Sequence, residues 1–379
     1  MKDGLGPLAV SRIANCLEHC FTQNKCHFDK RLFELDALKD LENNELKQRV
    51  KHIISVLRSH FPEEFDQCEP ILRAVPLHWD AGDPEDPLRG FAAWPLIDFV
   101  SHIGIDAPKA ALDLLKTLTP LFSAEFAIRD FLIRHTGVTL EIIKPWLDHP
   151  DEHVRRLVSE GTRPRLPWGQ HLKQFVHDPK PILPLLDALI TDPSLYVRRS
   201  VANNLNDIGK DHPSVLLDFC QKWLTETEKA SSDIRGRVTW VVGHATRSLV
   251  KQGHPRSFPI LGYTAEPKIR IDKLALAQKS LCIGESLEFC IELTSLEPNQ
   301  RFVLDYAIHY RKANGKLAPK VFKLKNCAPK NEEKLTIRKS QSFKLISTRK
   351  FHVGEHILAA HINGVEFARA TFLLAGESS

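Results

Sequence analysis

The sequence predicts an all-α repeat solenoid followed by a small all-β sandwich, and three observations support this fold class. Apolar residues recur at helical spacing through most of residues 5–253, and a weak internal repeat lies within that region. After a segment rich in proline and glycine, the apolar period changes to two. The length of 379 residues accommodates two domains of ordinary size. We expect the helical domain over residues 1–262 and the sandwich over residues 263–379.

The first helices are expected between residues 5 and 60, where Leu46, Val50, Ile53 and Leu57 recur at helical spacing. The stretch from Pro76 to Pro95 is rich in proline, glycine and aspartate, and it predicts a long loop. Helical periodicity returns near residue 97 and continues to about residue 253, where a linker is expected over residues 253–267.

The later helical region contains the internal repeat. Residues 149–158 align with residues 192–201 at a spacing of 43, and residues 234–238 repeat the end of the pattern 37 residues later. A helix pair every 40–47 residues, with Asp and Pro before a Val-Arg helix start, is typical of HEAT-type solenoids. Stacked helix pairs form a concave face, so we expect the functional surface there.

Beyond the linker, alternating apolar residues indicate strands over residues 287–293 and 302–310. Asn314-Gly315 and Asn363-Gly364 predict tight hairpin turns. About seven strands in some 110 residues fit the size of an immunoglobulin-like sandwich. Cys282 and Cys290 are too close in sequence for an antibody-type disulfide.

The composition, 42% hydrophobic and 26% charged, is that of an ordinary globular protein. No apolar run approaches the roughly 20 residues that a membrane-spanning helix needs. Residues 1–4 open into no apolar signal region, and the 8 irregularly spaced cysteines indicate free thiols in a reducing cytosol. We therefore expect a cytoplasmic protein without a membrane partner.

The positive charge is concentrated toward the C-terminus. Residues 265–379 carry 19 Lys and Arg against 12 Asp and Glu, and residues 301–350 alone carry 14 against 3. Such asymmetry points to a polyanionic partner, with nucleic acid favoured over membrane because no basic amphipathic helix accompanies it. Arg311, Lys312 and Lys316 flank one hairpin turn and are candidate DNA contacts.

The repeat helices supply further cations. Arg155 and Arg198 follow the repeated valine, where they could either pair with an aspartate of the neighbouring repeat or contact DNA. The residues that follow them, Arg156 and Arg199, lie 100° further round the helix and cannot make the same pairs between repeats. Together with other cations they could contact phosphates along the concave face; this set is Arg156, Arg163, Arg165, Arg199, Lys210, Arg247 and Lys251.

Two carboxylates are expected near equivalent ends of adjacent repeat helices. Glu160 ends one helix, before a turn through two prolines to Trp168, and Asp207 ends the next. Both could face one cleft beside the tryptophan. The structural alternative is that Glu160 pairs with Arg163 and that Asp207 caps the loop before Lys210.

Three strings in this region resemble the HEAT-like DNA alkylation repair glycosylases, AlkC more than AlkD. They span residues 122–129, 154–169 and 196–208, and the last two are long and specific. The resemblance covers roughly residues 5–262, and the strands that follow are similar to the immunoglobulin-like extension of one AlkC branch. It implies a bacterial base-excision-repair enzyme that hydrolyses the N-glycosidic bond of cationic N-methylated bases, 3-methyladenine and 3-methylcytosine, without a metal or other cofactor.

By the same resemblance, Glu125, Glu160 and Asp207 would be the catalytic carboxylates, Trp168 the aromatic residue beside the lesion, and Arg156 and Arg163 a DNA clamp. A cationic base is a good leaving group, so carboxylates need only stabilise the oxocarbenium-like sugar and orient water. The family grips the duplex backbone and need not flip the lesion into a deep cavity. We expect a monomer acting on alkylated double-stranded DNA at the nucleoid.

Alternatives remain open. A HEAT-type scaffold could bind DNA or protein without catalysis, its carboxylates merely capping helices, and the sandwich could be a protein-interaction module. A zinc site from Cys16, Cys20, Cys26, His19 and His27 is disfavoured because the sequence has no second ligand set at metal-binding spacing. No glycine-rich nucleotide-binding loop is present.

Overall fold

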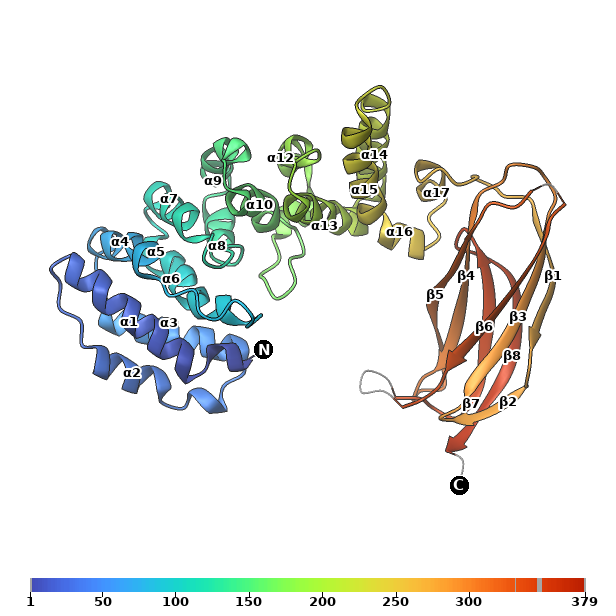
Figure 1. The fold of residues 1–379 in the computed structure, drawn as a ribbon, viewed down its shortest axis with the longest axis horizontal. Helices are drawn as coiled ribbons and strands as arrows, with labels where there is room; N and C mark the ends of the chain where they lie inside the picture. Colours follow the sequence, from blue (N-terminus) through green and yellow to red (C-terminus); the bar gives the residue numbers. More distant parts are fainter. Residues whose placement is uncertain (1, 331, 346–349, 378–379) are drawn as a thin grey trace. The chain divides into compact units, whose positions relative to one another are not determined.

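The computed structural model describes residues 2–330, 332–345 and 350–377 (Figure 1). The chain divides into two compact units, one formed by Met1–Asp211 with Ala230–His244 and the other by His212–Lys229 with Ala245–Ser379. This division assigns three helices before residue 262 to the unit that contains the sandwich. The domain boundary expected at residue 262 therefore stays a prediction.

The first unit is helical. Its α-helices are α1 (Pro7–Gln23), α2 (Lys30–Leu38), α3 (Leu46–His60), α4 (Phe65–Arg73), α5 (Val75–His78), α6 (Trp94–Gly104), α7 (Pro108–Leu118), α8 (Ala127–Arg134), α9 (Thr136–Ile143), α10 (Glu152–Gly161), α11 (Lys173–His177), α12 (Leu183–Leu189), α13 (Leu195–Asp211) and α15 (Ser232–Ala245). Short 3-10 helices connect them at η1 (Lys2–Leu5), η2 (Leu41–Asn43), η3 (Arg89–Ala93), η4 (Lys144–Asp148) and η5 (Lys180–Ile182). Among the described residues, no helix is both long and apolar enough to cross a membrane.

The internal repeat corresponds to α10 and α13, which pack directly against each other. Val154 and Val197 occupy equivalent positions in the repeat, and both are fully buried between the helices. Asp151 caps α10, because its carboxylate accepts a hydrogen bond of 2.7 Å from the backbone N–H of His153. The predicted helical solenoid is confirmed.

Two expected irregular segments are shorter than predicted. Pro76 lies in the first turn of α5 and Pro95 in the first turn of α6, so the predicted loop is interrupted at both ends. Proline is tolerated at these positions because its missing N–H would be unpaired there anyway. The expected linker likewise contains α17 (Ser257–Ile260), whose Phe258 is buried.

The second unit contains the sandwich together with α14 (Pro213–Glu226), α16 (Arg247–Lys251) and α17. A three-stranded sheet has the order β1-β3-β6, and a five-stranded sheet the order β2-β8-β7-β4-β5. The strands are β1 (Ile269–Leu276), β2 (Ser280–Ile283), β3 (Ser286–Ser295), β4 (Phe302–Arg311), β5 (Leu317–Cys327), β6 (Lys334–Ser342), β7 (Gly354–Ile362) and β8 (Val365–Glu377). The immunoglobulin-like sandwich is thus confirmed.

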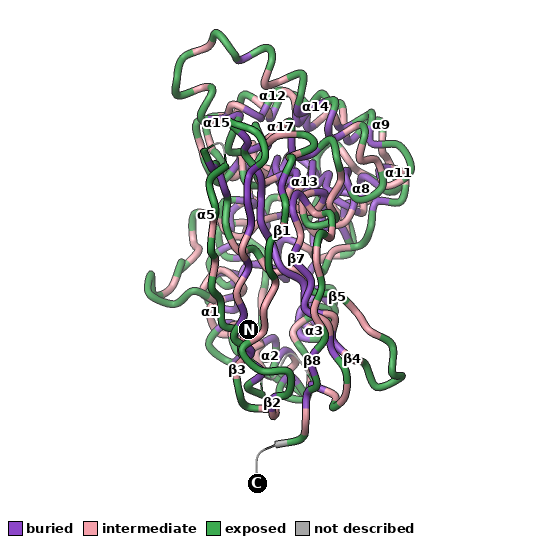
Figure 2. The backbone as a smooth tube through the Cα atoms, turned by 90° about the vertical axis from the view of Figure 1, so that its right-hand side faces the viewer, coloured by how far each residue is buried: buried purple, intermediate pink, exposed green. Residues whose placement is uncertain are grey.

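Both predicted hairpins form. Asn314-Gly315 joins the antiparallel strands β4 and β5, and Asn363-Gly364 joins β7 and β8. Alternate residues of β4, such as Leu304, Tyr306 and Ile308, face the core of the sandwich. Figure 2 shows such buried positions along the strands and helices. The other set of residues in β4 and β7 lies on the opposite face of the five-stranded sheet.

Candidate active site

A pocket of about 490 Å³ opens in the first unit between the segment that precedes α8, the helix α10 and the segment that follows α10. Glu125, Glu160, Arg156, Arg163 and Trp168, all of them predicted site residues, line it. Asp207 is not among the lining residues, and its side chain is only 2% exposed. The structure therefore brings the predicted carboxylates and tryptophan into one region, with Asp207 on the inner side of Arg163.

The end of α10 fixes where these groups lie. Gly161 allows α8 to approach, since a Cβ there would come within 2.6 Å of the Cγ2 of Ile128. The buried Arg129 of α8 donates hydrogen bonds to the carbonyls of Gly161, at 2.9 Å, and Gln170, at 2.6 Å. This guanidinium therefore ties the end of α10 to the far side of the loop that carries Trp168.

Trp168 has a strained backbone, with φ of +63°, a conformation that bulky residues rarely adopt. The Nζ of Lys47 donates a hydrogen bond to its carbonyl oxygen. Its indole stays half exposed, at 51%. Strain of this kind costs about 1–3 kcal/mol and persists only where the surroundings hold it, often at functional sites. The loop thus presents an aromatic face at the mouth of the pocket.

The charged groups alternate in a continuous chain. Arg156 lies 3.0 Å from a carboxylate oxygen of Glu125 and 3.6 Å from one of Glu160. Arg163 lies 2.7 Å from Glu160 and 2.9 Å from Asp207, whose other oxygen is 2.7 Å from the Nζ of Lys210. Glu160 and Arg163 thus form the ion pair that the structural alternative expected, and both residues also line the pocket.

The two glutamates that share Arg156 have opposite pKa shifts. Burial raises the pKa of Glu125, and the charge of Arg156 offsets this only in part. Burial would also raise the pKa of Glu160, but Arg156 and Arg163 outweigh it and lower the pKa below its usual range. Ser200 Oγ also donates a 2.6 Å hydrogen bond to Glu160. Glu160 is therefore a fixed anion, whereas Glu125 is the more easily protonated of the two.

Aromatic side chains also line the pocket. Trp94 stacks on Phe126, with ring centroids 4.8 Å apart, and on Phe122 at 5.5 Å. On another side, the guanidinium of Arg156 lies over the ring of Tyr196, 4.6 Å from its centroid. The pocket can therefore hold a flat, positively charged group between aromatic faces and carboxylates.

The predicted DNA contacts in the repeat are mostly paired within the protein. Arg155 binds Asp192 through hydrogen bonds of 2.7 and 3.1 Å, so it makes the expected alternative pair with an aspartate of the neighbouring repeat. Arg198 instead donates to the carbonyls of residues 192 and 193. Arg165 binds Asp211 through two hydrogen bonds of 2.8 Å. Arg155 and Arg198 therefore stabilise the turns between repeat helices.

Arg156 and Arg163 also differ from the exposed phosphate contacts that were expected, with side chains only 14% and 9% exposed. They are drawn inward because the buried carboxylates of Glu160 and Asp207 and the partly buried Glu125 need positive partners. Lys210 and Arg199 are exposed in the first unit. In the second unit, Lys251, Lys312 and Lys316 are exposed, while Arg247 and Arg311 are half-buried. Their contact with DNA stays a prediction.

Sequence reasoning missed several pocket residues. Tyr196 and His153 occupy equivalent repeat positions, 43 residues apart, and both line the pocket. This correspondence could have identified them, since the register of the repeat was already known. Arg129 and Ser200 do not line the pocket but hold residues that do, and the sequence gave no signal for them because only the packing of α8 and α13 against α10 shows their role. Of the disfavoured zinc set, Cys16 and Cys20 are buried and Cys26 is exposed.

Comparison with known proteins finds relatives that match along most of the chain. The sequence is 35% identical over 339 residues to the uncharacterized protein YhaZ of Bacillus subtilis (strain 168), covering 89% of this chain and 90% of that protein. The structure is similar to that of Pseudomonas fluorescens alkylpurine DNA glycosylase AlkC bound to DNA containing an abasic site analog, with a TM-score of 0.87, 34% identity and 99% coverage of both chains. Residues 270–376 match the family described as the C-terminal Ig-like domain of the uncharacterised protein YhaZ.

Proposed function

The chain belongs to the AlkC family, and on that basis we propose that it is a DNA glycosylase that hydrolyses the N-glycosidic bond of cationic N-alkylated bases in double-stranded DNA. We expect 3-methyladenine and 3-methylcytosine as substrates and a monomer as the active form. The observation that carries the proposal is the pocket in which Glu125 and Glu160 lie beside Trp168 and Tyr196.

The charge of the substrate accounts for much of the chemistry. A base methylated at N3 is cationic and leaves readily, so the enzyme must chiefly stabilise the positive charge that develops on the sugar. Glu160, held ionised by Arg156 and Arg163, supplies a fixed negative charge for this purpose. A preorganised ion of this kind needs no reorientation during the reaction.

Glu125 is the candidate for positioning water. Its side chain is 15% exposed, against 6% for Glu160, so it is the more accessible of the two. Its raised pKa makes it the stronger base of the pair, and a general base works best with a pKa near the operating pH. We therefore assign Glu125 to the water that attacks C1′ and Glu160 to electrostatic stabilisation.

Asp207 acts through Arg163 in this proposal. One of its oxygens binds Arg163 and the other Lys210, which leaves it no direct access to the pocket. We therefore regard it as a positioning residue that keeps Arg163 directed at Glu160. Trp168 provides the aromatic face for the cationic nucleotide, an interaction worth about 1–2 kcal/mol in a desolvated site.

The test is the release of free base. The purified full-length protein is incubated in excess with duplexes that contain one 3-methyladenine or one 3-methylcytosine, and the free base and the abasic site are both quantified. The undamaged duplex is the control. Equal amounts of free base and abasic site are expected from the damaged duplexes only. Binding of DNA without release of any methylated base would instead favour the non-catalytic scaffold.

A further inference from the structure

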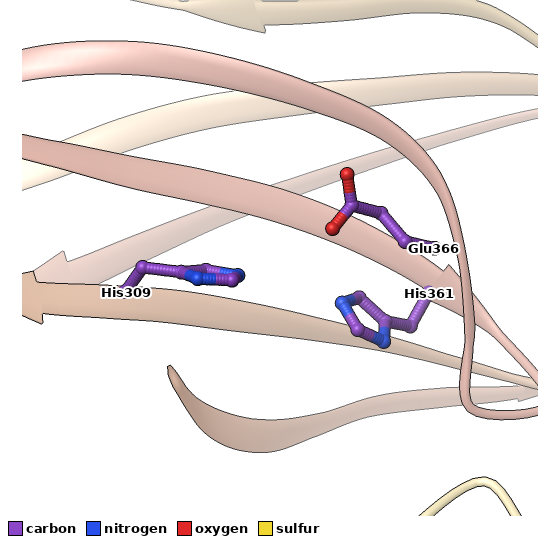
Figure 3. A group of neighbouring side chains, drawn as sticks. All are labelled: His309, His361 and Glu366. Atoms are coloured by element: carbon purple, nitrogen blue, oxygen red, sulfur yellow. The ribbon is translucent and has the colours of Figure 1, made fainter. Parts of the chain in front are cut away.

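The second unit contains a cluster of potential metal ligands outside the proposed active site. His309 of β4, His361 of β7 and Glu366 of β8 each offer one donor atom, and these atoms lie within 4.8 Å of one another. Figure 3 shows the two imidazole rings directed toward each other, with the carboxylate of Glu366 beside them. The three residues come from neighbouring strands of the five-stranded sheet.

The strand register explains how the side chains meet. His309 and His361 lie on the face of the sheet opposite the sandwich core, because the core takes the alternate residues of β4 and β7. Between them on the same face, Ala307 pairs with Ala359. These small side chains leave room for the two rings to lean toward each other along the strands. Glu366 pairs directly with His361 across β7 and β8.

The hydrogen bond that His361 makes through its other ring nitrogen fits metal binding. Nδ1 of His361 lies 3.2 Å from the carbonyl oxygen of Gly364, which it can reach only as an N–H donor. This hydrogen bond leaves the lone pair on Nε2. Histidine ligands of metals commonly have this arrangement, because the bond from the other nitrogen fixes both tautomer and ring orientation.

Within the part of the chain that the structure describes, the Nε2 atoms of both His309 and His361 are buried and have no hydrogen-bond partner. Leaving a buried polar atom unpaired is unfavourable. Two unpaired nitrogens close to one carboxylate form a donor set that a divalent cation would satisfy.

The neighbouring charges allow a cation. Arg369 binds one oxygen of Glu366 at 2.5 Å, which leaves the second oxygen for a ligand. Asp305 lies directly opposite His361 on β4, and its Oδ1 is buried without a partner among the described residues. Lys323 pairs with Asp305 across β4 and β5. The two carboxylates thus compensate the two basic side chains, and an added divalent cation meets no excess of positive charge.

We propose that His309, His361 and Glu366 bind a divalent transition metal ion, with Zn²⁺ as the expected ion. Two imidazole nitrogens and a carboxylate oxygen are a common ligand set for Zn²⁺, which takes them at about 2.0–2.2 Å and leaves a fourth position for water. The side chains must therefore close in on the ion by small movements. Bound metal would join β4, β7 and β8 on the outer face and stabilise the sandwich.

The sequence contains no metal motif of this spacing, which is why no metal was expected there. The ligands lie at positions 309, 361 and 366, and only the pairing of three strands brings them together. The cluster belongs to the second unit and the proposed active site to the first, and we propose a stabilising role for the metal ion, not a catalytic one.

The test uses the full-length protein freed of metal with a chelator. Isothermal titration with Zn²⁺ and the thermal unfolding midpoint are measured for the wild type, for Glu366→Gln and for His309→Ala/His361→Ala. We expect the wild type to bind one more equivalent than either variant, and only the wild type to gain thermal stability from that equivalent. His27→Ala, an exposed histidine beside Cys26, is the control and should behave like the wild type.

Free cysteines can also bind zinc, so the ligand type is measured independently of the variants. X-ray absorption at the zinc edge of the wild type loaded with one equivalent should show nitrogen and oxygen ligands only. Sulfur ligands, or the same stoichiometry and stabilisation in Glu366→Gln as in the wild type, would overturn the proposal. Should the double variant fail to fold, Glu366→Gln and the absorption spectrum still decide the question.

Discussion

At the scale of single residues, the site is governed by one guanidinium shared between two carboxylates. Arg156 contacts Glu125 and Glu160, yet their pKa values shift in opposite directions because only Glu160 has Arg163 and Ser200 as further partners. Pairs of titratable groups whose pKa values are pushed apart often mark a division into acid-base and electrostatic roles. The proposed roles of the two glutamates follow from this asymmetry.

Removing either charge should slow the reaction. We expect Glu125→Gln and Glu160→Gln each to reduce the rate of single-turnover excision by at least about 10²-fold, the scale of one electrostatic contact in a site. Binding of the lesion duplex should persist. Glu141→Gln, an exposed glutamate on α9, is the control for lost charge. Wild-type rates in both glutamine variants would remove these residues from the active site.

The same substitutions separate the two roles by pH. The pKa of Glu125 is raised by burial, so a base at this position loses activity as the pH falls through that raised value. We expect an acid limb in the excision rate of the wild type and its absence in Glu125→Gln, whose residual rate should be flat. Glu160→Gln should keep the limb at a lower overall rate. An unchanged limb in Glu125→Gln would assign the base to another group.

Asp98 should make stability depend on pH. Burial raises its pKa to about 7, although the indole N–H of Trp94 donates a 2.7 Å hydrogen bond to it. Because the folded pKa lies above the unfolded one, the folded state holds the proton longer and loses stability as the pH rises from about 4 to about 7. The side chain is partly exposed, so we expect a loss of about 2 kcal/mol rather than the full shift.

Asp98→Asn should remove this pH dependence. Thermal unfolding between pH 4 and 8 should show the stability of the wild type falling relative to that of the variant across this window. Asp106→Asn, on an exposed aspartate, should reproduce the wild-type curve. Parallel curves for the wild type and Asp98→Asn would show that Asp98 titrates normally in the folded protein.

At the scale of elements, periodicity predicted most of the fold because helix and strand packing leave direct traces in the sequence. Val154 and Val197 mark the α10 and α13 repeat, and Asn314-Gly315 marks a hairpin. The unpredicted parts depend on contacts distant in sequence. The helix α17 forms in a proline-rich linker, where its Phe258 is buried. Arg129 donates a hydrogen bond to the carbonyl of Gln170, 41 residues away in the sequence.

In the candidate site, too, some features could be predicted from the sequence and others depend on contacts between distant residues. Glu160 and Asp207 could be placed on adjacent repeat helices, but the spacing of 43 relates Glu160 to Asn203, and Asp207 lies one turn before the end of α13 instead of ending the helix as expected. The pairing of Arg163 with Glu160 was the structural alternative, but its simultaneous pairing with Asp207 could not be derived, since it depends on the turn after α10 directing that side chain inward. Arg156 and Arg163 then face inward because Glu160 and Asp207 are buried and Glu125 is partly buried. A linear pattern of cations cannot separate such interior partners from surface phosphate contacts.

The close approach of α8 and α10 at Gly161 should be sensitive to one added methyl group. In Gly161→Ala, the Cβ would overlap the Cγ2 of the buried Ile128, which cannot turn away freely. We expect a loss of about 1–3 kcal/mol in the free energy of unfolding, as for other overpacked cores. Excision should fall as well, because the shift changes the distance between α10 and Glu125. Chemical denaturation and single-turnover kinetics measure the two effects.

Gly236→Ala is the matched control, since a Cβ at this position in α15 has nothing within 4 Å among the described residues. Alanine is the better helix former by about 0.5–1 kcal/mol, so this variant should be as stable as the wild type or more so. A stabilised Gly161→Ala would show that the helices can separate without cost, and that the glycine has no packing role.

At the scale of the whole molecule, the second unit has the larger excess of positive charge, yet its role cannot be tested cleanly by truncation. Cutting the chain after the linker would remove strands that bind the retained segment. The backbone N–H of Thr264, for example, donates a 2.7 Å hydrogen bond to the carbonyl of Arg301, and Asn363 donates one of 2.8 Å to the carbonyl of Thr264. Substitutions on the exposed surface avoid this difficulty.

The hairpin between β4 and β5 offers such a surface. Lys312 and Lys316 are exposed beside its turn, which closes through a hydrogen bond of 2.9 Å from the N–H of Lys312 to the carbonyl of Lys316. Because this bond uses the backbone only, both side chains can be shortened without loss of the turn. A tethered basic surface raises the effective concentration of DNA at the active site even when its own affinity is weak.

We therefore expect Lys312→Ala/Lys316→Ala to weaken binding to damaged and undamaged duplexes alike and to lower the slope of log K against log salt by up to about 2. Excision should fall at subsaturating protein and recover at saturation, since the chemistry is untouched. Lys334→Ala/Lys339→Ala removes the same charge from β6 in the other sheet and should change the slope less. Equal slopes for the two double variants would mean that the hairpin only adds to the general positive charge. A slope unchanged from the wild type in both would exclude a phosphate-binding role for these lysines and leave the sandwich as a module for a protein partner.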